Sequence, residues 1–141
     1  MLYFKKLHPD AVVPTRAHAG DAGMDVYTIE EVIIEPRSDI KTGLGLSCEF
    51  DSKYVLLVFN KSGRATMLKL NKGAEVIDSG YRGEIHVHLF NHSNERVIIP
   101  KGEKIAQLIL MPIWNGLPEE VYELSDTERG SGGFGSTGVK K

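Results

Sequence analysis

The chain has 141 residues, of which 41% are hydrophobic and 26% are charged, and its formal charge is -2. This length predicts one domain that can bury a core unaided, and the lone cysteine, Cys48, excludes a disulfide framework within the chain. The near-neutral charge argues against nucleic-acid binding, and the lack of a long apolar run or of a signal-peptide pattern predicts a soluble cytoplasmic protein without membrane contact.

Short strand-like runs, separated by turn signals, follow one another along the chain. Leu44 to Phe50 alternates between apolar and polar residues, which predicts a half-buried strand with Cys48 as an inert core thiol. The unbroken apolar run from Tyr54 to Phe59 predicts a strand buried on both faces. Further strands are predicted at 25–29, 32–35, 84–91, 96–99, 104–111 and 121–124, with Trp114 packing at a strand end.

This pattern predicts an all-β fold, a jelly-roll-like distorted barrel or sandwich. Only Gly63 to Asn71 could form a short helix. The tail from Ser125 to Lys141 differs in composition, because five of the fifteen glycines lie in its Gly130 to Gly138 segment. We therefore divide the chain into a β domain, 1–124, and a flexible Gly-rich tail, 125–141. The tail is either a frayed terminus or an arm that wraps an anion with its amides and Arg129.

A possible phosphate cradle follows the predicted buried strand. Lys61, Ser62 and Gly63 offer a cation, a hydroxyl and a permissive backbone at the strand exit. The alternative is an ordinary turn, since the P-loop pattern is absent.

The segment 76–84 has the pattern of a strand, a tight turn and a returning strand. Asp78 at the mouth of this hairpin can orient a water molecule, and Tyr81 offers a flat ring. The alternative is that Asp78 only caps its own turn.

Two histidines, His86 and His88, share one face of the next predicted strand. With Glu95 they approach the cupin metal pattern GX5HXHX3-4EX6G, although six residues separate His88 from Glu95 and no later histidine completes the set. A pair of ordinary surface histidines is the alternative.

Taken in order, these segments resemble the five motifs of the trimeric dUTP pyrophosphatase (dUTPase) family, over about residues 5–138. The matching segments are 22–26, 61–65, 76–84, 102–108 and 129–138. The resemblance implies a β-fold homotrimer that hydrolyses dUTP to dUMP and pyrophosphate with Mg²⁺. This reaction keeps uracil out of DNA and supplies dUMP for dTMP synthesis.

The resemblance also implies a role for each matching residue. Asp78 would activate the water that attacks the α-phosphorus, Tyr81 would lie against the deoxyribose, and Asp25 would bind waters of the Mg²⁺ shell. The remaining sugar and uracil contacts would be Asn71, Gly73, Val76, Ile77 and Phe134. The phosphate contacts would be Lys61, Ser62, Gly63, Gln107, Arg129, Gly133, Gly135 and Ser136. Each site would combine three subunits, the tail of one covering the site of a neighbour.

Several positions depart from the family pattern. Lys61 and Lys104 stand where the family usually has Arg. Lys61 cannot make the bidentate contact to phosphate that Arg makes, and Arg64 is a candidate substitute. The difference at Lys104 is interpreted as structural. The stretch between the second and third motifs is slightly shorter than usual, and Glu75 occupies a position often held by Gly.

Three alternatives remain open. A dCTP deaminase would share the core fold and the hairpin, but it needs a catalytic Glu where this chain has His88. A metal-binding cupin would use His86, His88 and Glu95. A non-catalytic dUTPase-like binding protein is disfavoured by Asp78, Tyr81 and Arg129.

Overall fold

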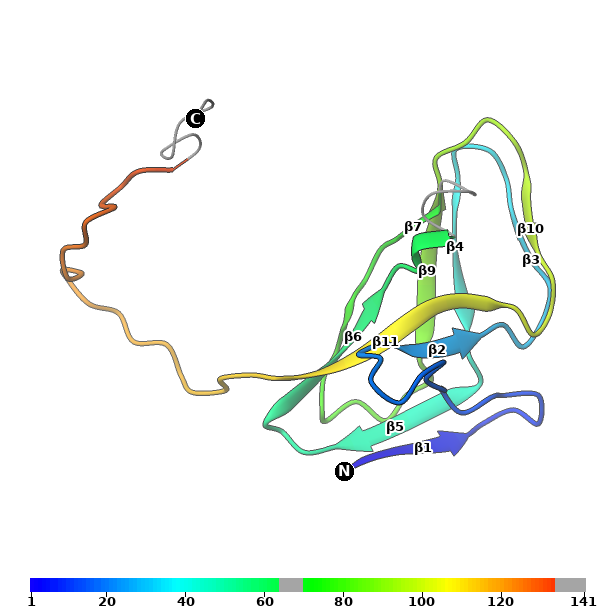
Figure 1. The fold of residues 1–141 in the computed structure, drawn as a ribbon, viewed down its shortest axis with the longest axis horizontal. Coiled ribbons are helices and arrows are strands. Elements are labelled where there is room, and N and C mark those ends of the chain that lie inside the picture. Colours follow the sequence, from blue (N-terminus) through cyan, green and yellow to red (C-terminus); the bar gives the residue numbers. More distant parts are fainter. Residues whose placement is uncertain (64–69, 134–141) are drawn as a thin grey trace.

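Antiparallel strands make up nearly all the regular structure of residues 1–63 and 70–133, which are the residues that the computed structural model describes (Figure 1). The strands are β1 (Leu2–Lys6), β2 (Met24–Tyr27), β3 (Val32–Ile34), β4 (Asp39–Gly43), β5 (Leu46–Phe50), β6 (Tyr54–Phe59), β7 (Leu70–Lys72), β8 (Val76–Ile77), β9 (His86–Asn91), β10 (Val97–Ile99) and β11 (Lys104–Pro112). Ser62 and Gly63 have helical conformation, but most of the predicted 63–71 helix lies outside the described residues. The all-β prediction is confirmed.

The strands form four sheets. The largest has the order β2-β11-β6-β8, the next has the order β4-β9-β7, and β1-β5 and β10-β3 form two-stranded sheets. Within the described ranges these sheets do not join into a closed barrel. Their inner faces enclose one apolar core that runs from Ala11 to Leu108. The core therefore ends before the tail begins.

The burial of β5 follows its alternating sequence only in part, because Ser47 on the polar face is also buried. Leu44, Leu46, Cys48 and Phe50 are 1%, 1%, 3% and 6% exposed, as the alternation predicts. Burial raises the pKa of the Cys48 thiol, although the nearby Arg82 opposes this shift, so the thiol is an inert part of the core. Between β4 and β5, Gly45 has a left-handed φ of 63° and lies against His8 and Ala11, which leaves no space for a side chain.

The prediction that β6 is buried on both faces is wrong for the single chain. Leu56 and Val58 are buried, whereas Val55, Leu57 and Phe59 on the opposite face are only partly buried. The reason is that the core packs against one face of this sheet. An apolar run does not reveal by itself whether a second layer covers the other face.

The predicted strand at 121–124 is also wrong. After β11 ends at Pro112, the chain leaves the body as an extended segment, residues 113–133, which we call the C-terminal arm (Figure 1). Tyr122 and Leu124 are fully or almost fully exposed, and Trp114, expected to pack at a strand end, is 77% exposed. A strand needs a hydrogen-bonded neighbour, and none of the described strands pairs with this segment.

Candidate active site

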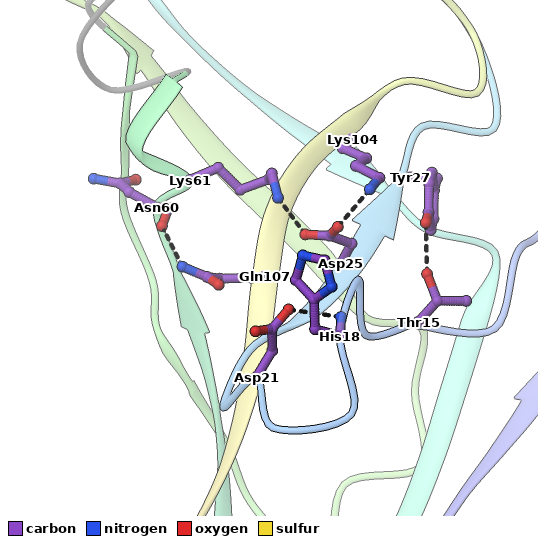
Figure 2. Close-up of polar contacts among 9 residues, drawn as sticks. All are labelled: Thr15, His18, Asp21, Asp25, Tyr27, Asn60, Lys61, Lys104 and Gln107. Carbon is purple, nitrogen blue, oxygen red and sulfur yellow. Dashed lines mark hydrogen bonds and ion pairs between the residues drawn. The ribbon is translucent and has the colours of Figure 1, made fainter.

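The first group of predicted site residues is centred on a buried carboxylate, Asp25 of β2. Its side chain is 7% exposed, and its backbone is paired with Thr15 through N–H···O contacts of 2.7 and 3.2 Å. Two ammonium groups bind the two carboxylate oxygens: Lys61 contacts Oδ1, and the Nζ of Lys104 lies 2.7 Å from Oδ2 (Figure 2). The centre therefore combines one negative and two positive charges.

Two opposing effects act on the pKa of Asp25. Burial disfavours the charged carboxylate, but the hydrogen bonds and charges of Lys104 and Lys61 outweigh burial and lower the pKa. The same pairing raises the pKa of Lys104. The side chains of Lys61 and Lys104 are 29% and 44% exposed, so an anion arriving from solvent can reach both cations.

Lys104 reaches Asp25 because β11 contains an irregularity. Gln107 pairs with Asp25 and Lys104 pairs with Tyr27, and the register shifts between Lys104 and Ala106. Strict alternation would place Lys104 and Gln107 on opposite faces of the strand, and the bulge brings both to the Asp25 side. Lys104, whose difference from the family pattern was interpreted as structural, is therefore a direct partner of the Asp25 carboxylate.

Gln107 is fixed from two sides. Its amide donates to the carbonyl of Asn60 at 2.8 Å, and a Cβ on Gly23 would come within 2.0 Å of its Oε1. The Asn60 side chain donates in turn to Asn71 Oδ1 at 2.6 Å. Asn71, predicted as a uracil contact, therefore lies beside the first group in this chain. Asn60 was not predicted as a site residue, because an asparagine after a strand indicates only a turn.

We expect Asp25→Asn to destabilise the protein by a few degrees in Tm at neutral pH, because it leaves two cations facing each other without a carboxylate. Since folding lowers the pKa of Asp25, its contribution is fully present above the ordinary Asp pKa and is lost as the pH falls through the lowered value. Thermal melts of both proteins from pH 8 to strongly acid pH measure this difference.

The matched control is Asp10→Asn, which removes an ion pair with Lys101 whose side chains are 45% and 54% exposed. This control should change Tm little at any pH. A difference between wild type and Asp25→Asn that does not shrink in acid would contradict the assignment.

The second group lines a cavity of about 230 Å³ beside the β8 turn. Its lining residues are Val58, Ala74, Glu75, Val76, Ile77, Asp78, Tyr81, Glu84, Ile85 and His86. The turn is held by the Tyr81 N–H, which donates to the Asp78 carbonyl at 3.0 Å, and by the Tyr81 hydroxyl, which donates to the Glu84 carbonyl at 2.9 Å. The cavity thus brings together four predicted residues, Val76, Ile77, Asp78 and Tyr81.

Asp78 and Lys61 lie toward opposite ends of β6. Ile77 pairs with Leu56, so Asp78 lies near the start of β6, whereas Lys61 follows its end. Because a strand rises about 3.3 Å per residue, roughly 15 to 20 Å separates them along the sheet. One chain therefore does not bring Asp78 to Asp25.

The third group lies on the arm. Arg129 forms a local turn in which its Nε donates to the Gly132 carbonyl at 2.9 Å, and Gly130 has a left-handed φ of 52°. Arg129 and Gly133 are exposed, and the arm points away from the body (Figure 1). Four further predicted residues, Arg64, Phe134, Gly135 and Ser136, lie outside the described residues.

The histidine pair has other partners. His88 Nε2 lies 2.7 Å from Asp39 Oδ2, and His86 Nδ1 lies 2.9 Å from the Glu84 carbonyl. Within residues 1–63 and 70–133, no group of three His, Cys, Asp or Glu side chains is arranged to hold a metal ion. These contacts favour structural roles over the cupin alternative. None of the helical segments described is long and apolar enough to cross a membrane.

Comparison with known proteins relates this chain to one enzyme family. A model of the dUTPase family matches residues 10–138. The deoxyuridine 5'-triphosphate nucleotidohydrolase of Clostridioides difficile is 46% identical over 140 residues, which cover 97% of each chain. The protein of that name from Nautilia profundicola is 45% identical over 139 residues, 97% of this chain and 98% of that one. The structure of a Staphylococcus bacteriophage 80alpha dUTPase with dUPNHPP superposes with a TM-score of 0.93 at 30% identity, over 99% of both chains.

Proposed function

This chain belongs to the dUTPase family and is a dUTP diphosphatase, and we propose that it cleaves dUTP to dUMP and pyrophosphate with a water molecule activated by Asp78. The observation that carries the proposal is that residues 10–138, which match the family, contain all five motif segments. The cavity supports the role of Asp78, because Asp78 lines it at a turn that hydrogen bonds of Tyr81 hold. In this role Asp78 orients the water and accepts its proton.

The Asp25 centre supplies the charge that a triphosphate needs. Phosphoryl transfer is catalysed mainly by positioning and by neutralising charge, and Lys61 and Lys104 present two partly exposed cations. Gln107, held between Gly23 and Asn60, adds an amide at the same place. Ser62 and Gly63 are exposed directly after Lys61 and extend this surface. We assign the phosphate chain to this centre.

A magnesium ion fits the centre only together with the substrate. Asp25 is a single buried carboxylate with an ammonium group on each oxygen, which does not suit a cage made of protein ligands. It does suit Mg²⁺, which keeps most of its waters and is bound through one or two carboxylates plus substrate phosphates. Asp25 would hold the ion through a bound water, and the ion would neutralise phosphate charge.

A complete site requires more than one copy of the chain. Asp78 and Lys61, which binds Asp25, lie toward opposite ends of β6, and Arg129 lies on an arm directed away from both. We propose a homotrimer in which one subunit supplies the Asp25 centre, a second the Asp78 cavity and a third the arm. The exposed apolar residues of the arm, such as Leu117 and Tyr122, support this arrangement because a neighbouring subunit would cover them.

We expect pyrophosphate release from dUTP with Mg²⁺, and little release from dCTP, dTTP or UTP. The proposed reason is that the hairpin excludes the 5-methyl of thymine while Tyr81 leaves no space for a ribose 2′-hydroxyl. Parallel assays for pyrophosphate and ammonia with the four nucleotides measure this selectivity. Ammonia from dCTP would favour the deaminase alternative, and the absence of turnover with dUTP would exclude the proposed reaction.

A further inference from the structure

A three-residue linker, residues 73–75, carries the chain from one sheet to the next. It connects β7 of the β4-β9-β7 sheet to β8 of the β2-β11-β6-β8 sheet. At its start the Gly73 N–H donates to the His88 carbonyl at 2.8 Å, and at its end the Glu75 carbonyl accepts from the Val58 N–H at 2.8 Å. Ala74, between these two bonds, lines the cavity that holds Asp78.

An ion pair spans this linker. The ammonium group of Lys72 binds the carboxylate of Glu75, and the Lys72 side chain is only 8% exposed while that of Glu75 is 52% exposed. The Lys72 Nζ also lies over the Phe59 ring, 5.2 Å from its centroid. A cation this deeply buried is strongly constrained to its partners, because leaving it unpaired is costly. Lys72 therefore ties Glu75, at the cavity wall, to β6.

Asp78 is held by separate contacts. Val76 and Ile77 pair with Leu57 and Leu56 of β6, and the Tyr81 N–H donates to the Asp78 carbonyl. These contacts are backbone contacts that involve neither Lys72 nor the Glu75 side chain. Loss of the Lys72–Glu75 pair would thus free the Glu75 side chain at the cavity wall while the backbone at Asp78 stays held.

We propose that Lys72 and Glu75 are positioning residues that fix the wall of the pyrimidine subsite and set the enzyme's affinity and selectivity for the base. The inference rests on the proposed function, in which the 76–84 hairpin excludes the 5-methyl group of thymine. The pair spans the linker whose Ala74 and Glu75 line the cavity. It acts through the linker rather than on the reacting atoms.

The informative variant is Lys72→Met, which keeps the side-chain length beside Phe59 and leaves only the half-exposed Glu75 without its partner. We expect KM for dUTP to rise about tenfold, with kcat changed less than about twofold and a reduced preference for dUTP over dTTP. Lys72→Arg should keep KM for dUTP near the wild-type value, because it keeps the positive charge. Glu75→Ala should reproduce the rise in KM.

Two further measurements separate positioning from stability and from the proposed reaction. Glu35→Gln, which breaks the exposed Arg96–Glu35 pair, should leave KM and Tm unchanged. The Kd for dUMP should rise in Lys72→Met as KM does. This binding measurement tests the inference even without turnover. If the wild-type enzyme does not hydrolyse dUTP, that result overturns the proposed function and not the inference. Unchanged KM and dUMP Kd in both Lys72→Met and Glu75→Ala, with Tm lowered, would reduce the pair to a structural role.

Discussion

Replacing Asp78 with Asn is expected to lower kcat for dUTP about a thousandfold, the range typical of losing a general base. The amide keeps the size of the side chain but cannot take a proton from water. Asp78 lines the cavity at a turn fixed by Tyr81, so the substitution should not disturb the backbone. Steady-state pyrophosphate release measures the effect.

Binding should survive this substitution. The analogue dUpNHpp, titrated against wild type and Asp78→Asn with Mg²⁺, should bind both with similar Kd, because the phosphate-binding groups are unchanged. Asp51→Asn, at the exposed turn where Asp51 Oδ1 accepts from the Lys53 N–H, is the matched control and should retain full activity. An Asp78→Asn enzyme that still turns over at the wild-type rate would remove Asp78 from its catalytic role.

Truncation after Glu128 is expected to lower kcat/KM for dUTP about a hundredfold while leaving Tm unchanged. The deleted segment contains Arg129 and the glycine-rich motif, which we propose closes over the phosphates and excludes bulk water. Stability should be unaffected because the core ends at Leu108 and the described part of the arm is exposed. The comparison needs initial rates over a range of dUTP concentrations, and thermal melts.

A truncation that removes only residues 139–141, beyond the last motif, is the control and should retain activity. A mixing experiment then tests whether the arm acts between chains. When the Asp78→Asn subunit and the subunit truncated after Glu128 are refolded together, mixed assemblies contain some sites with both an intact Asp78 and an intact arm. Activity should reappear on mixing. No recovery in assemblies shown to be mixed would indicate that each chain builds its own site.

The strands were predictable where the spacing of apolar residues along the sequence matches the side chains that face the core. In the 44–50 run the apolar face meets the core, as the alternation predicts, but Gly45 and Ser47 of the other face are buried as well. Three strands, β1, β4 and β7, were not predicted. β4 and β7 contain polar residues beside turn signals, β1 is a short run that ends in two lysines, and each pairs with β5 or β9. The 121–124 run fails for the opposite reason: it has strand-like residues but no described neighbour.

The chemical groups of the site were visible in the sequence, because their types and order follow the five motifs of the dUTPase family. The tertiary structure alone decided how these groups are arranged. The bulge in β11 places Lys104 on Asp25, which strict alternation excludes, and the length of β6 separates that centre from Asp78. The physical reason is that motifs record which side chains occur along one chain, whereas register, pairing and burial depend on contacts between segments distant in sequence. The Lys72–Glu75 ion pair was likewise decided by the tertiary structure, because the low exposure of the Lys72 side chain depends on its packing beside Phe59.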